Sequence, residues 1–113
     1  MVLNDERVLK ILAQARARST ELGLKTSTAV VDENGLLQGF VRMEGARFTT
    51  VEIAQGKARG SAGVRRPTVD VAERAQRPVF MYQMVHEGFI FAQGGVPIMD
   101  GEEFIGAVGV SGA

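Results

Sequence analysis

Apolar and small side chains recur every three or four residues between positions 5 and 22, which is the spacing of an α-helix with one buried face. Asn4 stands just before this run and suits an N-cap, because its side-chain oxygen can accept a hydrogen bond from a free backbone N–H. Gly23 stands just after it and can adopt the left-handed conformation that ends many helices. The pattern predicts a helix over residues 5–22 whose inner face carries Val8, Ile11, Leu12, Ala15, Ser19 and Leu22.

The pattern changes to that of β-strands after this helix. Residues 26–32 and 36–43 are rich in β-branched and apolar side chains, and Glu33-Asn34-Gly35 between them predicts a hairpin turn. Strand character returns at residues 89–92 and continues into a second hairpin, for which we expect a type I′ turn at Asp100-Gly101.

The middle of the chain returns to helical spacing over residues 48–63, with small side chains at Ala54, Ala58, Gly60, Ala62 and Gly63. Small residues let a helix approach either a sheet or a flat ligand closely, and ordinary helix–sheet packing is the commoner cause. A proline then breaks the helix within Arg65-Arg66-Pro67-Thr68. We expect Thr68 to cap a short helix over residues 69–76, and a further helical or irregular piece over residues 79–85.

The order of these elements is a helix, a hairpin, helices and then three strands, which predicts an α+β fold with a five-stranded antiparallel sheet. No linker or repeat divides the chain, so the whole of residues 1–113 is expected to form one domain. The five expected strands are residues 26–32, 36–43 and 89–92, the arm before Asp100, and residues 104–110.

Composition narrows the function classes. The 13 basic and 13 acidic side chains balance, so no net field favours nucleic acid or an anionic membrane surface. The absence of cysteine excludes thiolate chemistry, disulfides and iron–sulfur clusters. Neither a signal peptide nor an apolar run of membrane-spanning length is recognisable, and we expect a cytoplasmic protein without nucleic-acid or membrane partners.

A glycine pair and a group of charged residues form the main candidate site. We interpret Gly94-Gly95, followed by Pro97, as a tight loop that borders a pocket. Arg42 and Glu44 are two residues apart at the end of a strand, and Lys57 lies on the next helix. Cations beside a glycine-lined pocket would suit a carboxylate ligand. An internal salt bridge from Arg42 or Lys57 to Glu44 explains the same residues equally well.

His86 is the single imidazole of the chain. It could serve as an axial haem ligand or as a general base. A lone histidine in a loop is more often a surface or capping residue, so both interpretations stay open.

Several segments resemble the GlcG/HbpS-like family, also called the haem-degrading domain family, which includes the C-terminal domain of PduO-type adenosyltransferases. The segment Arg42-Met43-Glu44-Gly45-Ala46 is similar to the family's Arg-Met-Asp-Gly-Ala. The order Gly94-Gly95-Val96-Pro97-Ile98, then Asp100-Gly101, then Gly109-Val110-Ser111-Gly112 is the most specific part. Further similarity lies in Val30-Val31-Asp32, Ile53-Ala54, Lys57-Ala58-Arg59 and Arg66-Pro67-Thr68.

The resemblance implies a profilin-like three-layer α/β/α fold with a five-stranded antiparallel sheet, assembly into homo-oligomers, and haem as a candidate cofactor. It also implies a further C-terminal helix, which is absent from the residues up to Ala113. The residues from Gln83 to Phe91, which include His86, do not match the family pattern.

These residues and the resemblance suggest three alternative functions. The first is a small-ligand-binding protein that holds haem or a related tetrapyrrole against Gly94-Gly95, with Arg42 or Lys57 as anchor and His86 as axial ligand. The second is an enzyme or enzyme subunit acting on a small carboxylated metabolite, with Glu44 or His86 moving protons. The third is an assembly module without a ligand.

Overall fold

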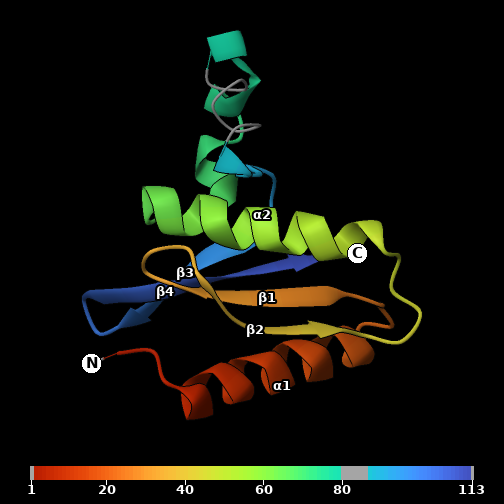
Figure 1. The fold of residues 1–113 in the computed structure, drawn as a ribbon. Helices are drawn as coiled ribbons and strands as arrows, with labels where there is room; N and C mark the ends of the chain where they lie inside the picture. The colour runs from red at the N-terminus through yellow and green to blue at the C-terminus, as the bar shows by residue number, and fades with distance from the viewer. Residues whose placement is uncertain (1, 80–86, 113) are drawn as a thin grey trace.

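A computed structural model describes residues 2–79 and 87–112 of the chain. Two long helices and four strands form its body (Figure 1). In chain order the elements are α1 (Asp5–Glu21), β1 (Ser27–Asp32), β2 (Leu37–Arg42), α2 (Thr49–Val64), the 3₁₀ turns η1 (Thr68–Val71) and η2 (Arg74–Gln76), β3 (Gly95–Asp100) and β4 (Glu103–Ser111).

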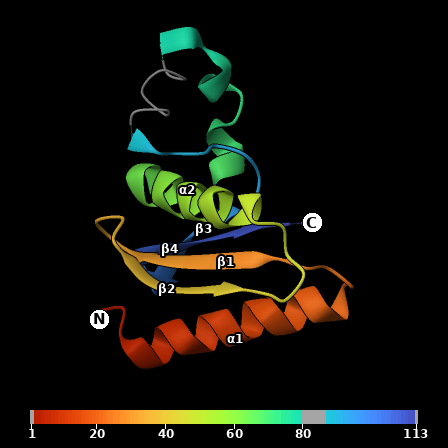
Figure 2. The same ribbon diagram turned by 45° about the vertical axis from the view of Figure 1, so that its right-hand side comes forward.

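The sheet lies between the two long helices, so the α+β fold has three layers (Figure 2). On one side α1 packs against β1 and β2, and Val8, Leu12 and Val30 are buried between them. On the other side α2 lies across the centre of the sheet, where Ala54, Ala58 and Ala107 belong to a second core. Apolar residues that alternate along the strands fill both cores, as expected for a sheet covered on two faces.

The sheet has four antiparallel strands in the order β2-β1-β4-β3 within the described residues, so the expectation of a five-stranded sheet is not confirmed. Residues 89–92 do not form the fifth strand. The segment instead crosses the outer side of α2, where the N–H of Ile90 donates to the carbonyl oxygen of Gly56 at 3.0 Å. Its apolar side chains are buried by a helix rather than by the sheet, which explains why a strand-like composition is misleading here.

Small residues on α2 and β4 allow close packing on both sides of this helix. Towards the sheet, a Cβ on Gly109 would collide with the carbonyl oxygen of Ala54 and lie 2.6 Å from the nitrogen of Ala58. Away from the sheet, a Cβ on Gly56 would lie 2.7 Å from the Ile90 side chain. Close backbone packing, the commoner of the two explanations considered from the sequence, therefore accounts for these positions.

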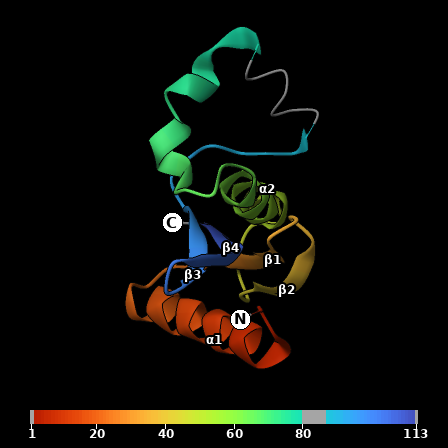
Figure 3. The ribbon, with the colours of Figure 1, turned by 90° about the vertical axis from the view of Figure 1, so that its left-hand side faces the viewer.

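The segment after α2 forms an outer layer beyond that helix (Figure 3). Val71 and Phe91 are buried there against Val64 and Phe89. The hydroxyl of Thr68 donates to the carbonyl oxygen of Ala92 and accepts from the N–H of Gly95 at 3.0 Å. Thr68 thus joins the outer layer to the start of β3 and is not a helix cap. In place of one helix over residues 69–76 there are two short 3₁₀ turns, and most of residues 79–85 lies outside the described residues.

Turn and cap residues follow the sequence signals in most places. The side chain of Asn4 accepts a hydrogen bond from the N–H of Arg7 at 2.8 Å, and Gly23 has a φ of 73°, so both ends of α1 are confirmed. The turn of the last hairpin differs from the prediction. Asp100 pairs with Glu103, which leaves Gly101 and Glu102 as the central residues, and only Gly101 has positive φ. That pattern belongs to a type II′ turn rather than type I′.

Candidate functional site

A pocket of about 480 Å³ lies between the C-terminal half of α1 and the end of β4. It exists because the two neighbouring strands have unequal lengths. β3 begins at Gly95, opposite Gly109, whereas β4 continues to Ser111. The N–H of Val110 still donates to the carbonyl oxygen of Gly94 in the preceding loop, so β4 extends past β3 only beyond Val110. The lining residues are Ala15, Arg18, Ser19, Leu22, Leu24, Thr26, Lys57, Gln93, Gly94, Val110, Ser111 and Gly112.

Lys57 reaches this pocket from α2. Its Nζ donates to the carbonyl oxygen of Val110 at 3.1 Å, at the open edge of β4. The side chain is half-buried, and desolvation by burial lowers the pKa of its amino group. Within residues 2–79 and 87–112, no carboxylate lies within ion-pair distance of Lys57. A cation without an anion in a pocket is able to receive an anionic or carbonyl group from a ligand.

The glycine pair has two separate tasks. Gly94 borders the pocket with a φ of 127°, and a Cβ there would lie 2.9 Å from the Nζ of Lys57 and 2.6 Å from the oxygen of Val110. Gly95 is buried beneath α2, where a Cβ would lie 2.5 Å from the carbonyl oxygen of Lys57. Gly94 therefore leaves space beside the amino group, and Gly95 lets β3 approach the helix.

The other sequence-predicted residues do not gather at this pocket. The guanidinium of Arg42 donates to the carbonyl oxygen of Ala46 at 2.8 Å, and Glu44 is exposed. Within the described residues, Arg7–Asp100 and Arg18–Glu21 form ion pairs, whereas Glu44 does not pair with Arg42 or Lys57. Pro97 lies in β3 opposite Ala107, outside the pocket lining, and His86 lies outside the described residues.

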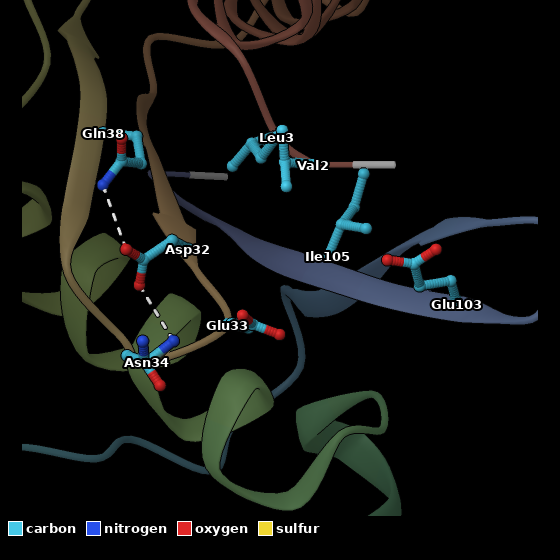
Figure 4. A pocket seen from close by; sticks show the side chains of 8 residues that line it. All are labelled: Val2, Leu3, Asp32, Glu33, Asn34, Gln38, Glu103 and Ile105. Atoms are coloured by element: carbon cyan, nitrogen blue, oxygen red, sulfur yellow. Dashed lines mark hydrogen bonds between the residues drawn. The ribbon is translucent and has the colours of Figure 1, made fainter.

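A second hollow, of about 200 Å³, lies near the β1–β2 turn and carries acidic side chains (Figure 4). Asp32 is already engaged there, because its Oδ1 accepts from the N–H groups of Asn34 at 2.8 Å and Leu36 at 3.0 Å. Its Oδ2 accepts from the Gln38 amide at 3.3 Å, and Glu103 stands beside Ile105 (Figure 4). No cluster of three or more metal-ligating side chains occurs in the described part of the chain. The hollow is thus explained by the construction of the hairpin.

A third hollow, of about 380 Å³, lies at the start of α2 and shares Ser111 and Gly112 with the Lys57 pocket. Lys25 and Arg47 line it, and α2 begins without a side-chain cap. Sequence reasoning did not single out either cation, because neither lies in a recognisable motif.

Comparisons with known proteins identify the family of this chain. The family profile described as "Haem degrading protein HbpS-like" matches residues 3–113. The chain belongs to this HbpS-like family. The GlcG protein of Escherichia coli K12 is 31% identical over 113 residues, covering 98% of this chain and 82% of GlcG. A double mutant of HbpS from Streptomyces reticuli is 27% identical with a TM-score of 0.89, covering 100% of this chain and 76% of that one.

A PduOC haem complex also shares the HbpS-like fold. It superimposes with a TM-score of 0.90 at 20% identity, covering 100% of this chain and 84% of the PduOC chain. At that identity the likeness concerns the fold alone. In the described residues, neither helix of this HbpS-like protein is long and apolar enough to cross a lipid bilayer.

Sequence reasoning found Lys57 and Gly94 but missed the rest of the pocket of this HbpS-like protein. The acceptor of the Lys57 hydrogen bond is a main-chain oxygen of Val110, for which no side-chain signal exists. Ala15, Ser19 and Leu22 were assigned to the inner face of α1. Ser19 is buried there, whereas Leu22 is 54% exposed, and the spacing does not show that this end of the helix lines a pocket.

Proposed function

We propose that this chain is a small-ligand-binding protein of the GlcG/HbpS type, and that its ligand lies in the pocket formed by Lys57, Gly94 and Val110. The observation that carries the proposal is the half-buried amino group of Lys57, which faces the pocket without a carboxylate partner in the described residues. Burying a cation without an anion costs free energy, and a ligand with an acidic group would offset that cost.

Haem or a related tetrapyrrole is the ligand class that the family description favours. The lining residues fit part of such a ligand. Leu22, Leu24 and Val110 offer apolar surface to a macrocycle, and Lys57 offers a cation to a propionate. When bound, haem would supply a redox-active iron. Among the described residues the pocket lining contains no histidine, cysteine, tyrosine or methionine, so it offers no usual ligand to the iron. His86, which lies outside the described residues, is proposed as axial ligand from the sequence alone.

A haem titration followed by absorbance tests this proposal. The wild-type protein should shift the Soret band, and Lys57→Met should weaken binding about tenfold through loss of a charge-assisted contact. His86→Ala should change the shape of the spectrum if the imidazole ligates the iron. Arg42→Ala is the matched control and should bind as the wild type does, because Arg42 is engaged with Ala46. The absence of a Soret shift with the wild-type protein would exclude haem as the ligand.

The enzyme alternative receives less support from the geometry. Glu44 is exposed and does not line the Lys57 pocket, so it is not placed to move a proton on a ligand held by Lys57. We therefore propose ligand binding as the function. We also propose a cytoplasmic location, as expected from the sequence.

A further inference from the structure

Lys57 differs from the other two lysines of the chain in its surroundings. The sequence contains three lysines, Lys10, Lys25 and Lys57. Lys10 and Lys25 are exposed, whereas Lys57 is half-buried and desolvation lowers the pKa of its amino group. A lower pKa leaves more of the amine neutral near pH 7, and only the neutral amine has a lone pair for bond formation.

The geometry around the amino group leaves it open to a reactant. One N–H is directed at the carbonyl oxygen of Val110 at 3.1 Å, which orients the Nζ at the pocket wall. Gly94 leaves the adjacent space free, since a Cβ there would lie 2.9 Å from the Nζ. Ala15, Leu22 and Leu24 supply apolar surface on the α1 side of the same pocket. Burial beside apolar surface favours the neutral, nucleophilic form of a lysine amine.

We propose that the Nζ of Lys57 forms a reversible imine with a small carbonyl compound, an aldehyde or a 2-oxo acid, bound in this pocket. The inference rests on the ligand pocket of the proposed function and names a chemistry for it. Haem binding would use the charge of Lys57, whereas imine formation requires its nitrogen lone pair, so the two ideas can fail separately.

The reaction balances without an oxidant or a reductant. The lone pair of the Nζ attacks the carbonyl carbon, the carbonyl oxygen takes up a proton, and the nitrogen loses one, which gives a carbinolamine. Protonation of its hydroxyl group and loss of water then form the carbon–nitrogen double bond. Addition of water reverses both steps and releases the carbonyl compound and the free amine. Ser19 and Ser111 line the same pocket, and the Ser19 hydroxyl is already hydrogen-bonded to that of Thr26 at 2.7 Å.

Reductive trapping tests the inference on the wild-type protein. Butyraldehyde and 2-oxobutyrate, which have the same carbon number and differ in charge, are added in separate arms at pH 7 with cyanoborohydride, which reduces an imine to a stable amine. Peptide mass mapping then gives the occupancy at each lysine. We expect Lys57 to be labelled about tenfold more than Lys10 or Lys25 in at least one arm. Butyraldehyde labelling alone identifies an uncharged ligand, and 2-oxobutyrate labelling alone identifies an acid.

Labelling of Lys57 at or below the level of Lys10 and Lys25 in both arms would overturn the inference. The two exposed lysines are internal controls, so the outcome does not depend on a variant that folds poorly. Lys57→Arg removes the nucleophile, and we expect it to abolish the excess labelling. A Soret shift without preferential labelling would overturn the imine alone, and preferential labelling without a Soret shift would overturn haem alone.

Discussion

Lys57 and Gly109 show how much a single residue depends on the backbone of another element. Lys57 is held at the pocket by a carbonyl of β4, and Gly109 is required because α2 passes directly over it. The sequence indicated both residue types, a cation and strand glycines, since these stand out in a pattern of apolar residues. It could not indicate their partners, because main-chain atoms carry no residue-specific signal.

Gly109→Ala is expected to destabilise the fold by about 1–3 kcal/mol, because the new methyl group would meet backbone atoms of Ala54 and Ala58 that cannot move aside. Urea unfolding followed by circular dichroism measures this free energy. Gly101→Ala is the control, since nothing lies within 4 Å of the position and only the backbone strain at its φ of 63° remains. Equal losses in the two variants would contradict the packing account of Gly109.

The lowered pKa of Lys57 predicts how its contribution to stability varies with pH. Between the folded-state pKa and the ordinary lysine value, the unfolded chain binds more protons than the folded chain. The free energy of unfolding therefore rises with pH across that window. Lys57→Met should remove this rise, which urea midpoints measured for both proteins at neutral and alkaline pH would detect. Parallel pH curves for the two proteins would show that the group titrates normally in the fold.

At the scale of elements, periodicity predicted both long helices and the four strands that form, with ends one or two residues from the observed ones. It was wrong for residues 89–92, because apolar composition reports burial and does not say whether a sheet or a helix covers the segment. The glycines of α2 were the available clue. Gly56, Gly60 and Gly63 each face a side chain of that segment, respectively Ile90, Phe91 and Phe89.

Gly56→Ala should loosen the contact between α2 and the segment 87–92. The added methyl group would lie 2.7 Å from the Ile90 side chain, while the helix itself gains about 1 kcal/mol from the loss of glycine. Hydrogen exchange should therefore become faster at the Ile90 amide and stay unchanged in α1. Gly63→Ala is a milder comparison, because its contacts to the Phe89 ring begin at 3.1 Å. Unchanged exchange at Ile90 in both variants would contradict this contact.

The whole molecule has two cores on either side of one sheet, and it also exposes large apolar side chains. Val96 and Met99 on β3 and Leu22 beside the pocket are each about half exposed. The α+β class followed from the order of elements and the three-layer arrangement from the family resemblance, whereas the pocket depends on the different lengths of β3 and β4. That difference arises in the loop before Gly95 and could not be predicted from local pattern.

We expect the protein to form a homo-oligomer, since apolar side chains exposed on a small protein gain stability when a second copy covers them. Light scattering at micromolar concentration should give a mass that is a multiple of the 12.1 kDa chain. Val96→Lys places a charge on β3 and should lower that mass if this face is used. A wild-type mass of 12.1 kDa over the whole concentration range would refute assembly.

Pro97 and Thr68 restrict edge-to-edge strand pairing along β3. Because the N–H of Val110 donates to the oxygen of Gly94, the pairs Gly95–Gly109 and Pro97–Ala107 are not hydrogen-bonded to each other. The nitrogens of Gly95 and Pro97 therefore point away from β4. The outward N–H of Gly95 donates to the hydroxyl of Thr68, and Pro97 has no backbone N–H. A strand from a second molecule would therefore meet few free backbone N–H donors along β3, whereas β2 contains no proline. If sheets of two molecules join, we expect them to join through β2 and to stop at a closed pair, because β3 offers few donors for a further strand.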